Sequence, residues 1–346
     1  EAAMQMLDKV IDAKQANKDI EFQALSYKSA VLLSMHQFQQ ALDVAKLGAA
    51  INDRNSGIYG AMIDANVELG NYAEAVQLCD KMLALRPDLR SYSRASYIRQ
   101  IYGDNRGAID AMKMAVEAGV PGAENTEWAR VTLGDLYLNI GSIDTAEMLY
   151  KEALTRRPNY VYAEMGLSKV EKTKKNYDAA ITHCENAIRL ISESAFISTL
   201  GDLYQLKGDD KKAKEIHEDV HKLLEQSEKE QNDDAAKVKH NGARELAMAH
   251  MKVGNYDEAL EFAKQDISVR PNNIDANELI AWIYYMKADY ANAKMHADKM
   301  LATNTQNANT LHKAGLIYTK AGDTAKGNEL MLKAKTISPY IDPLIQ

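Results

Sequence analysis

A short motif recurs along this chain at a nearly constant interval of 34 residues. Three copies are almost identical: Gly-Asn-Tyr-Ala-Glu-Ala at 70–75, Gly-Asn-Tyr-Asp-Glu-Ala at 254–259 and Ala-Asp-Tyr-Ala-Asn-Ala at 288–293. The final small residues of nine copies are separated by 34, 33, 38, 34, 33, 46, 34 and 34 residues. Units of this length stack on their neighbours, so we expect one elongated array rather than several compact domains. The weaker copies are 36–41, 103–108, 141–146, 175–180, 208–213 and 322–327.

Each unit is predicted to be a pair of antiparallel helices. The chain has only 6 prolines and 18 glycines, and strand-like runs bounded by turn residues are missing. Gly134 and Ala146 fall where the two helix axes must approach closely, a place that excludes a large side chain. Gly70, Gly141 and Gly254 fall at the end of a first helix, where the turn often needs a positive φ.

A proline ends the second helix in three of the units, and two of the spacings between motif copies differ from the repeat length. The polar residue after Pro87, Pro158 or Pro271 is predicted to cap the next helix, which selects Asp88, Asn159 and Asn272. The 38-residue interval contains a longer surface loop at 120–125. The 46-residue interval contains a charged stretch after Val220, which predicts two lengthened helices turning near Asn232, with a domain boundary as the alternative.

One unit resembles the tetratricopeptide repeat (TPR) family, as found in multi-repeat arrays of the bacterial type. The matching residues are Leu133, Gly134, Tyr137, Ala146, Tyr150, Ala153 and Pro158. The resemblance extends over 22–339 and implies an all-α fold, a right-handed α-α superhelix (TPR solenoid) of about nine helix-turn-helix repeats. It divides the single domain 1–346 into a partial repeat (1–21), repeats (22–220), an extended helical hairpin (221–239), repeats (240–339) and a C-terminal tail (340–346).

Charge and hydropathy argue against a nucleic-acid-binding protein and against a membrane-spanning one. The net charge is −7, from 42 basic and 49 acidic residues, so no global positive field exists to hold a nucleic acid, and none is expected as a partner. No stretch approaches the roughly 18 apolar residues of a membrane span, which predicts a soluble chain. Because the first residue is Glu1, we expect an upstream segment to have been removed, and cytoplasmic and periplasmic locations both stay open.

The two cysteines predict no disulfide. Cys79 and Cys184 occupy the same core place three repeats apart, so stacked helices should hold them too far from each other to be bridged. Both are expected to be buried free thiols.

One catalytic pattern is present, the H-E-x-x-H stretch from His217 to His221, which on a helix can hold zinc. His217 falls at the core place of Cys79 and Cys184, and Asp219 is charged inside the pattern. A zinc hydrolase is therefore a minor alternative, and weak metal capture by His217 and His221 is favoured over it. No catalytic residue, metal or cofactor is expected.

The main expectation is a non-enzymatic scaffold that binds a protein or peptide, with no small-molecule substrate. A recruiting or sensor module of a larger multidomain protein is a further alternative. The resemblance implies that the first helix of each pair lines a concave groove, where aromatic, Met and Arg side chains suit a protein partner. The groove residues selected in this way are Arg90, Arg94, Tyr97, Trp128, Asp135, Asn139, Tyr162, Lys169, Lys172, Met248, Met251, Trp282, Tyr285 and Met286.

Two alternatives concern parts of this set. Arg90 and Arg94 are predicted to cradle a carboxylate with their planar donors, or else to form an ordinary solvated face. Trp282 and Tyr285 are predicted to be exposed in the groove, or else to cover the edge of a core.

Overall fold

A computed structural model describes residues 2–13, 17–232 and 240–345, which contain nineteen α-helices and no strand. Helix α1 (Ala2–Asp12) precedes nine helix pairs. The first five are α2 (Lys18–Ser34) with α3 (Phe38–Ile51), α4 (Ser56–Leu69) with α5 (Tyr72–Leu85), α6 (Leu89–Ile101) with α7 (Asn105–Glu117), α8 (Glu124–Asn139) with α9 (Ile143–Arg156) and α10 (Val161–Thr173) with α11 (Tyr177–Leu190). The last four are α12 (Ser194–Lys207) with α13 (Asp210–Asn232), α14 (Ala243–Lys252) with α15 (Tyr256–Val269), α16 (Ile274–Met286) with α17 (Tyr290–Met300) and α18 (Ala308–Lys320) with α19 (Thr324–Ile337).

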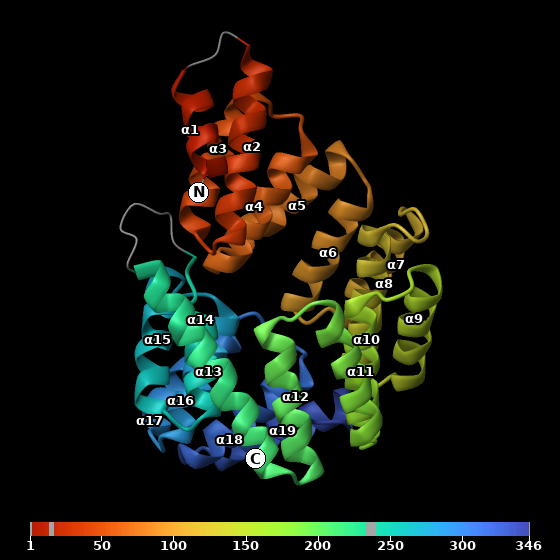
Figure 1. Ribbon diagram of the computed structural model, residues 1–346, viewed down its shortest axis with the longest axis vertical. Helices are drawn as coiled ribbons and strands as arrows, with labels where there is room; N and C mark the ends of the chain where they lie inside the picture. The colour runs from red at the N-terminus through yellow and green to blue at the C-terminus, as the bar shows by residue number, and fades with distance from the viewer. Residues whose placement is uncertain (1, 14–16, 233–239, 346) are drawn as a thin grey trace.

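The pairs stack into a solenoid that curls back on itself. Figure 1 shows the chain running from α1–α5 through α6–α11, around past α12, and back to α14 and α15, which lie beneath α3 and α4 in this view, before it ends in α16–α19 at the bottom. First helices of neighbouring pairs contact each other, as α2 does with α4 and α8 with α10. Because the inner side of a curved array is the crowded side, the first helices line the inside, as the resemblance implies. No helix in the described part of the chain combines the length and apolar character needed to cross a bilayer.

Small residues allow large side chains to fill the space between helices. The Tyr150 ring is fully buried, and a Cβ on either Gly134 or Gly166 would come within 2.5 Å of one of its ring atoms. Ala146 is also fully buried, as the close crossing requires. The Tyr150 hydroxyl donates a 2.8 Å hydrogen bond to Asp135 on the inner surface. This hydrogen bond therefore links the buried core of the repeat to the inner surface.

The second turn of the superhelix rests directly on the first. The guanidinium of Arg270, after α15, lies 2.7 Å from Glu68 of α4. The Asn273 side chain donates to the Glu68 carbonyl at 2.9 Å, and the backbone N–H of Ile274 donates to the Tyr72 hydroxyl at 2.9 Å. Two further contacts of this kind join the Asn241 N–H to the Met35 carbonyl at 3.0 Å and Lys172 to Asp342 at 2.8 Å. These contacts convert an open spiral into a nearly closed ring.

The structure corrects two local expectations. Helix α13 does reach Asn232, but α14 begins at Ala243 and has only 10 residues, so the second helix of the predicted hairpin is not lengthened; residues 233–239 lie outside the described part. Of the three predicted caps, only Asp88 is correct. In the other two helices the N-cap is the residue after the predicted one. Asn159 adopts a left-handed turn (φ 60°), and Tyr160 is the N-cap of α10. Asn273, rather than Asn272, is the N-cap of α16.

Both cysteines are buried and free, as predicted. Burial raises the pKa of the Cys79 thiol to about 11 and that of Cys184 to about 12. Since the thiolate is the reacting form, neither should react at pH 8 with a thiol-specific chromogenic disulfide in the native protein, whereas both should react in denaturant. Fast reaction of one thiol before unfolding would contradict its buried position.

Candidate binding groove

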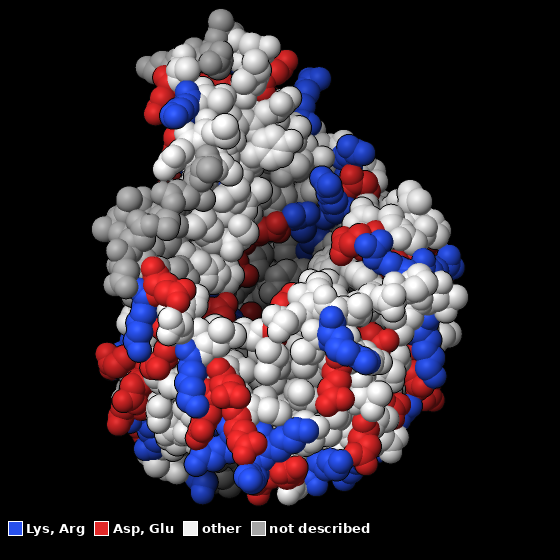
Figure 2. Space-filling view, viewed as in Figure 1, with Lys and Arg blue, Asp and Glu red and all other residues white. Residues whose placement is uncertain are grey.

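Two adjacent cavities open on the inner surface. The first, the Trp128 cavity, has a volume of about 730 Å³ and lies between α6 and α8, where Arg90, Arg94, Tyr97 and Trp128 line it. The second, the tail cavity, has a volume of about 650 Å³ and is bounded by α8, α10, α18 and the segment after α19. Asp135 lines both. Figure 2 shows the hollow in the middle of the molecule, with basic side chains over α6 at its rim and acidic ones on its wall.

Arg90 is positioned by the start of α6. Asp88 caps this helix by accepting hydrogen bonds from the N–H groups of Arg90 and Ser91, and the Ser91 hydroxyl accepts from the Asp88 N–H in return. The Arg90 side chain is exposed and has no ion-pair partner among the described residues. It is therefore available for a ligand.

Arg94 is not available in the same way. Its Nε and Nη2 atoms donate to the two carboxylate oxygens of Asp64 at 2.8 and 2.6 Å, a bidentate pair that uses the planar donor edge. Of the two arginines of the predicted cradle, Arg94 is held by α4 and Arg90 has no ion-pair partner among the described residues, so the cradle stays a prediction. The sequence did not reveal the pairing of Arg94, because Asp64 comes from the preceding repeat, 30 residues away.

Two aromatic side chains form the apolar part of the Trp128 cavity. Tyr97 is 44% exposed and Trp128 is 43% exposed, large fractions for such side chains. The surrounding walls raise the pKa of the Tyr97 hydroxyl, so it stays protonated at neutral pH. The cavity therefore offers two rings beside one free guanidinium, a combination typical of hot spots for protein ligands.

The other two groove cations selected from the sequence are paired within the protein, while Lys175 and Lys335 also line the tail cavity. Lys169 lies 2.8 Å from Asp135, which also accepts the Tyr150 hydrogen bond, and Lys172 lies 2.8 Å from Asp342. Asn139 lines the tail cavity with them. The chain after α19 thus forms one wall of the groove, a contact between residues 170 positions apart that the repeat register does not contain.

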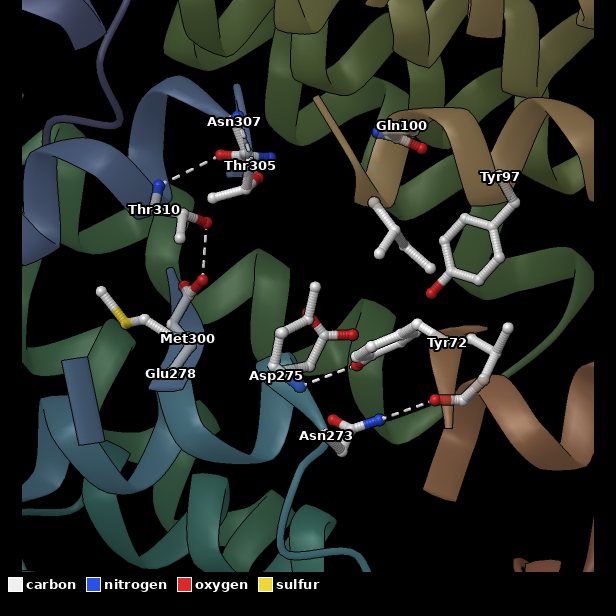
Figure 3. Close-up of a pocket in the computed structure, with 13 residues that line it drawn as sticks. Tyr72, Tyr97, Gln100, Asn273, Asp275, Glu278, Met300, Thr305, Asn307 and Thr310 are labelled. Atoms are coloured by element: carbon white, nitrogen blue, oxygen red, sulfur yellow. Dashed lines mark hydrogen bonds between the residues drawn. The ribbon is translucent and has the colours of Figure 1, made fainter. Parts of the chain in front are cut away.

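A third, smaller pocket of about 190 Å³ lies where the two superhelical turns meet. Figure 3 shows Tyr97 and Glu278 on opposite sides of it, with Asp275 between them. Burial opposes ionisation of Glu278, but Lys313 at 2.7 Å and the Thr310 hydroxyl at 2.6 Å hold its pKa below the usual range. No described residue donates such a hydrogen bond to Asp275, and burial raises the pKa of its carboxyl.

Neither acid was selected from the sequence, although a signal existed for Asp275. Asp275 lies eighteen residues before Ala293, and Arg90 lies eighteen residues before Ala108, so the two hold the same place in their repeats. The place of Asp275 is thus basic at Arg90 and aromatic at Trp128 and Tyr162 in other repeats.

The other predicted groove residues do not line these cavities. Trp282 and Tyr285 stack on each other, with ring centroids 4.7 Å apart, and pack partly against the C-terminal core. Lys313 lies 5.7 Å from the centre of the Trp282 ring. A binding role for this part of the set stays a prediction. The rest are Tyr162, Met248 and Met286, which are exposed, and Met251, which packs partly against the core of its repeat.

The H-E-x-x-H stretch does not form the two-histidine zinc site of a hydrolase. His217 is buried against Gly201, with Nε2 3.3 Å from Asp202, which also pairs with Lys252. His221 instead approaches His250 of α14. The core position predicted for His217 is confirmed. His217 and His221 contact different residues, so they do not face one common site.

Comparison with known proteins agrees with the repeat architecture. Two tetratricopeptide repeat models match residues 131–195 and 244–274, and a PPR repeat model matches residues 57–86. These matches show tetratricopeptide-type repeats in the chain, in agreement with its resemblance to that family. No curated protein matches its sequence.

Solved structures resemble this chain at low sequence identity, two of them with a TM-score above 0.5. Human IFIT1 in a dimer with PPP-AAAA matches at TM-score 0.51 and 14% identity, over 90% of this chain and 72% of that one. A monomeric IFIT1 mutant with m7Gppp-AAAA matches at TM-score 0.52 and 14% identity, over 96% and 76%. The Cut9–Hcn1 assembly matches at TM-score 0.44 and 14% identity, over 96% of this chain and 52% of that one. The chain therefore spans about half the length of that last relative.

Proposed function

We propose that this protein is a non-enzymatic scaffold that binds a segment of another protein in the Trp128 cavity. The observation that carries the proposal is the conjunction of Tyr97, Trp128 and the unpaired Arg90 on one wall of the inner surface. An apolar anchor fits between the two rings, and an acidic side chain or terminal carboxylate beside it fits the free guanidinium. The extended shape of the groove suits a peptide laid along it.

Electrostatics oppose a nucleic acid in the same place. Binding a phosphate backbone requires several cations without internal partners. Here Arg94 is occupied by Asp64, Lys169 by Asp135 and Lys172 by Asp342, which leaves Arg90 at the Trp128 cavity and Lys175 and Lys335 at the tail cavity. IFIT1 has been solved with PPP-AAAA, so a short single-stranded RNA is the appropriate negative control.

The test is selection from a random peptide library on the full chain, followed by affinity measurements on selected peptides. Trp128→Ala should weaken binding by about 2 kcal/mol, roughly 30-fold, the loss typical of a central aromatic contact. Met148→Ala is the matched control, because Met148 is 57% exposed but lies on the second helix α9, away from the inner surface. Peptides equally sensitive to both changes, or none sensitive to Trp128→Ala, would refute the site.

A further inference from the structure

The joint between α13 and α14 contains a cluster of metal-ligating side chains. His221 and Glu225 lie one turn apart on α13, and His250 lies on α14. The Nε2 atom of His221 is 3.1 Å from Nδ1 of His250, and Glu225 Oε1 is 3.7 Å from His221 Nε2. One ligand atom from each residue lies within 4.8 Å of the other two.

These distances fit one small divalent cation. Zinc binds imidazole nitrogens at about 2.0–2.1 Å, so two nitrogens on a tetrahedral ion are separated by about 3.3 Å. The observed 3.1 Å between the two imidazole nitrogens needs almost no adjustment. Glu225 Oε1 lies 3.9 Å from Nε2 of His250, the other ring nitrogen, so the carboxylate must turn toward Nδ1 to complete the site. The Glu225 side chain is 38% exposed and has room to turn, whereas the His221 and His250 side chains, 14% and 4% exposed, are fixed by packing.

The surroundings hold His250 ready to bind a metal. Its ring stacks on Phe262, with centroids 5.3 Å apart and planes 19° apart. Without a metal, the two imidazoles can only share one N–H as an ordinary hydrogen bond.

We propose that His221, Glu225 and His250 form a zinc site that joins α13 to α14. Two histidines and one carboxylate are a known zinc ligand set, and the fourth position is left for water. The site lies at the 46-residue interval, where the regular stacking of repeats is interrupted. A metal there bridges the repeats before and after the interruption. This proposal does not depend on the peptide-binding function, and it departs from the sequence-based expectation that the chain has no metal site.

The full chain, freed of metal with a chelator, would be titrated with Zn²⁺ by calorimetry and with Co²⁺ by visible absorption at neutral pH. We expect one equivalent of Zn²⁺ and the intense absorption of four-coordinate Co²⁺. Glu225→Gln removes an exposed ligand without threatening the fold, and should weaken Zn²⁺ binding at least as much as the roughly 10–100-fold loss caused by outer-sphere changes. His250→Gln should do the same, with circular dichroism as the check on folding.

The controls separate this site from its neighbours. Glu218→Gln changes the carboxylate of the H-E-x-x-H stretch, which lies near Lys214 instead, and should leave Zn²⁺ affinity unchanged. His36→Gln changes a second cluster, His36 with His240 and Glu245, and should also have no effect. Absence of stoichiometric Zn²⁺ binding, or a loss in His36→Gln with none in Glu225→Gln, would overturn the proposal.

Discussion

Replacing Arg270 with Met should destabilise the protein by about 3–5 kcal/mol, the cost typical of breaking a buried ion pair from one side. Nε and Nη2 of Arg270 donate to the two oxygens of Asp266 at 2.6 and 2.8 Å, and both side chains are about 5% exposed or less. Once the guanidinium is gone, the Asp266 carboxylate is left buried without a counter-charge. Urea denaturation followed by circular dichroism measures the loss.

Two further variants test the explanation. Glu68→Gln removes only the outer, 36% exposed partner of Arg270, so it should cost less than about 1 kcal/mol. The double change Arg270→Met with Asp266→Leu removes the stranded charge and should recover much of the stability. If Arg270→Met and Glu68→Gln were equally mild, the buried pair would have no special role.

Gly70→Ala should both destabilise the protein and separate the two superhelical turns. Gly70 has φ 79°, and a Cβ there would lie 2.4 Å from the backbone carbon of Asn272 in the opposite turn. The strain of a left-handed conformation costs about 1–2 kcal/mol, and forcing apart a packed contact costs roughly 1–3 kcal/mol more. Small-angle scattering should report a larger radius of gyration.

Gly254→Ala is the matched control. Gly254 ends the first helix of its own pair with φ 82°, but an added Cβ there would meet nothing within 4 Å. It should show the conformational cost alone, with unchanged dimensions in scattering. Equal behaviour of the two variants would mean that the turns do not touch in solution.

The helix pairs were predictable from the sequence, because the residues that determine each pair lie within one repeat. The spacing of the small residues located the helix pairs, and Ala146 and Gly134 lie at close crossings as expected. Asp88 was recognisable as a cap from its type and place. The hairpin at the long interval was half wrong, because a charged stretch does not determine where the following helix begins.

The candidate site was less predictable, because its electrostatics depend on contacts outside one repeat. Arg94 had the right position, but its partner Asp64 could be identified only from the packing of α4 against α6. The contact of Glu68 with Arg270 depends on a small rotation accumulated over six repeats, which no single repeat encodes. Trp128 and Tyr97 were located because the register alone determines which face they occupy.

The contact between superhelical turns has a consequence for how the chain folds. A typical solenoid is close to a one-dimensional system, in which each repeat responds only to its neighbours and unfolding can start at either end. Here the pairs Glu68–Arg270 and Asn105–Gln306 join residues about 200 positions apart. Closure of so long a loop is entropically slow. The last folding event should therefore be the docking of one half-turn on the other, and the two ends should melt together rather than separately.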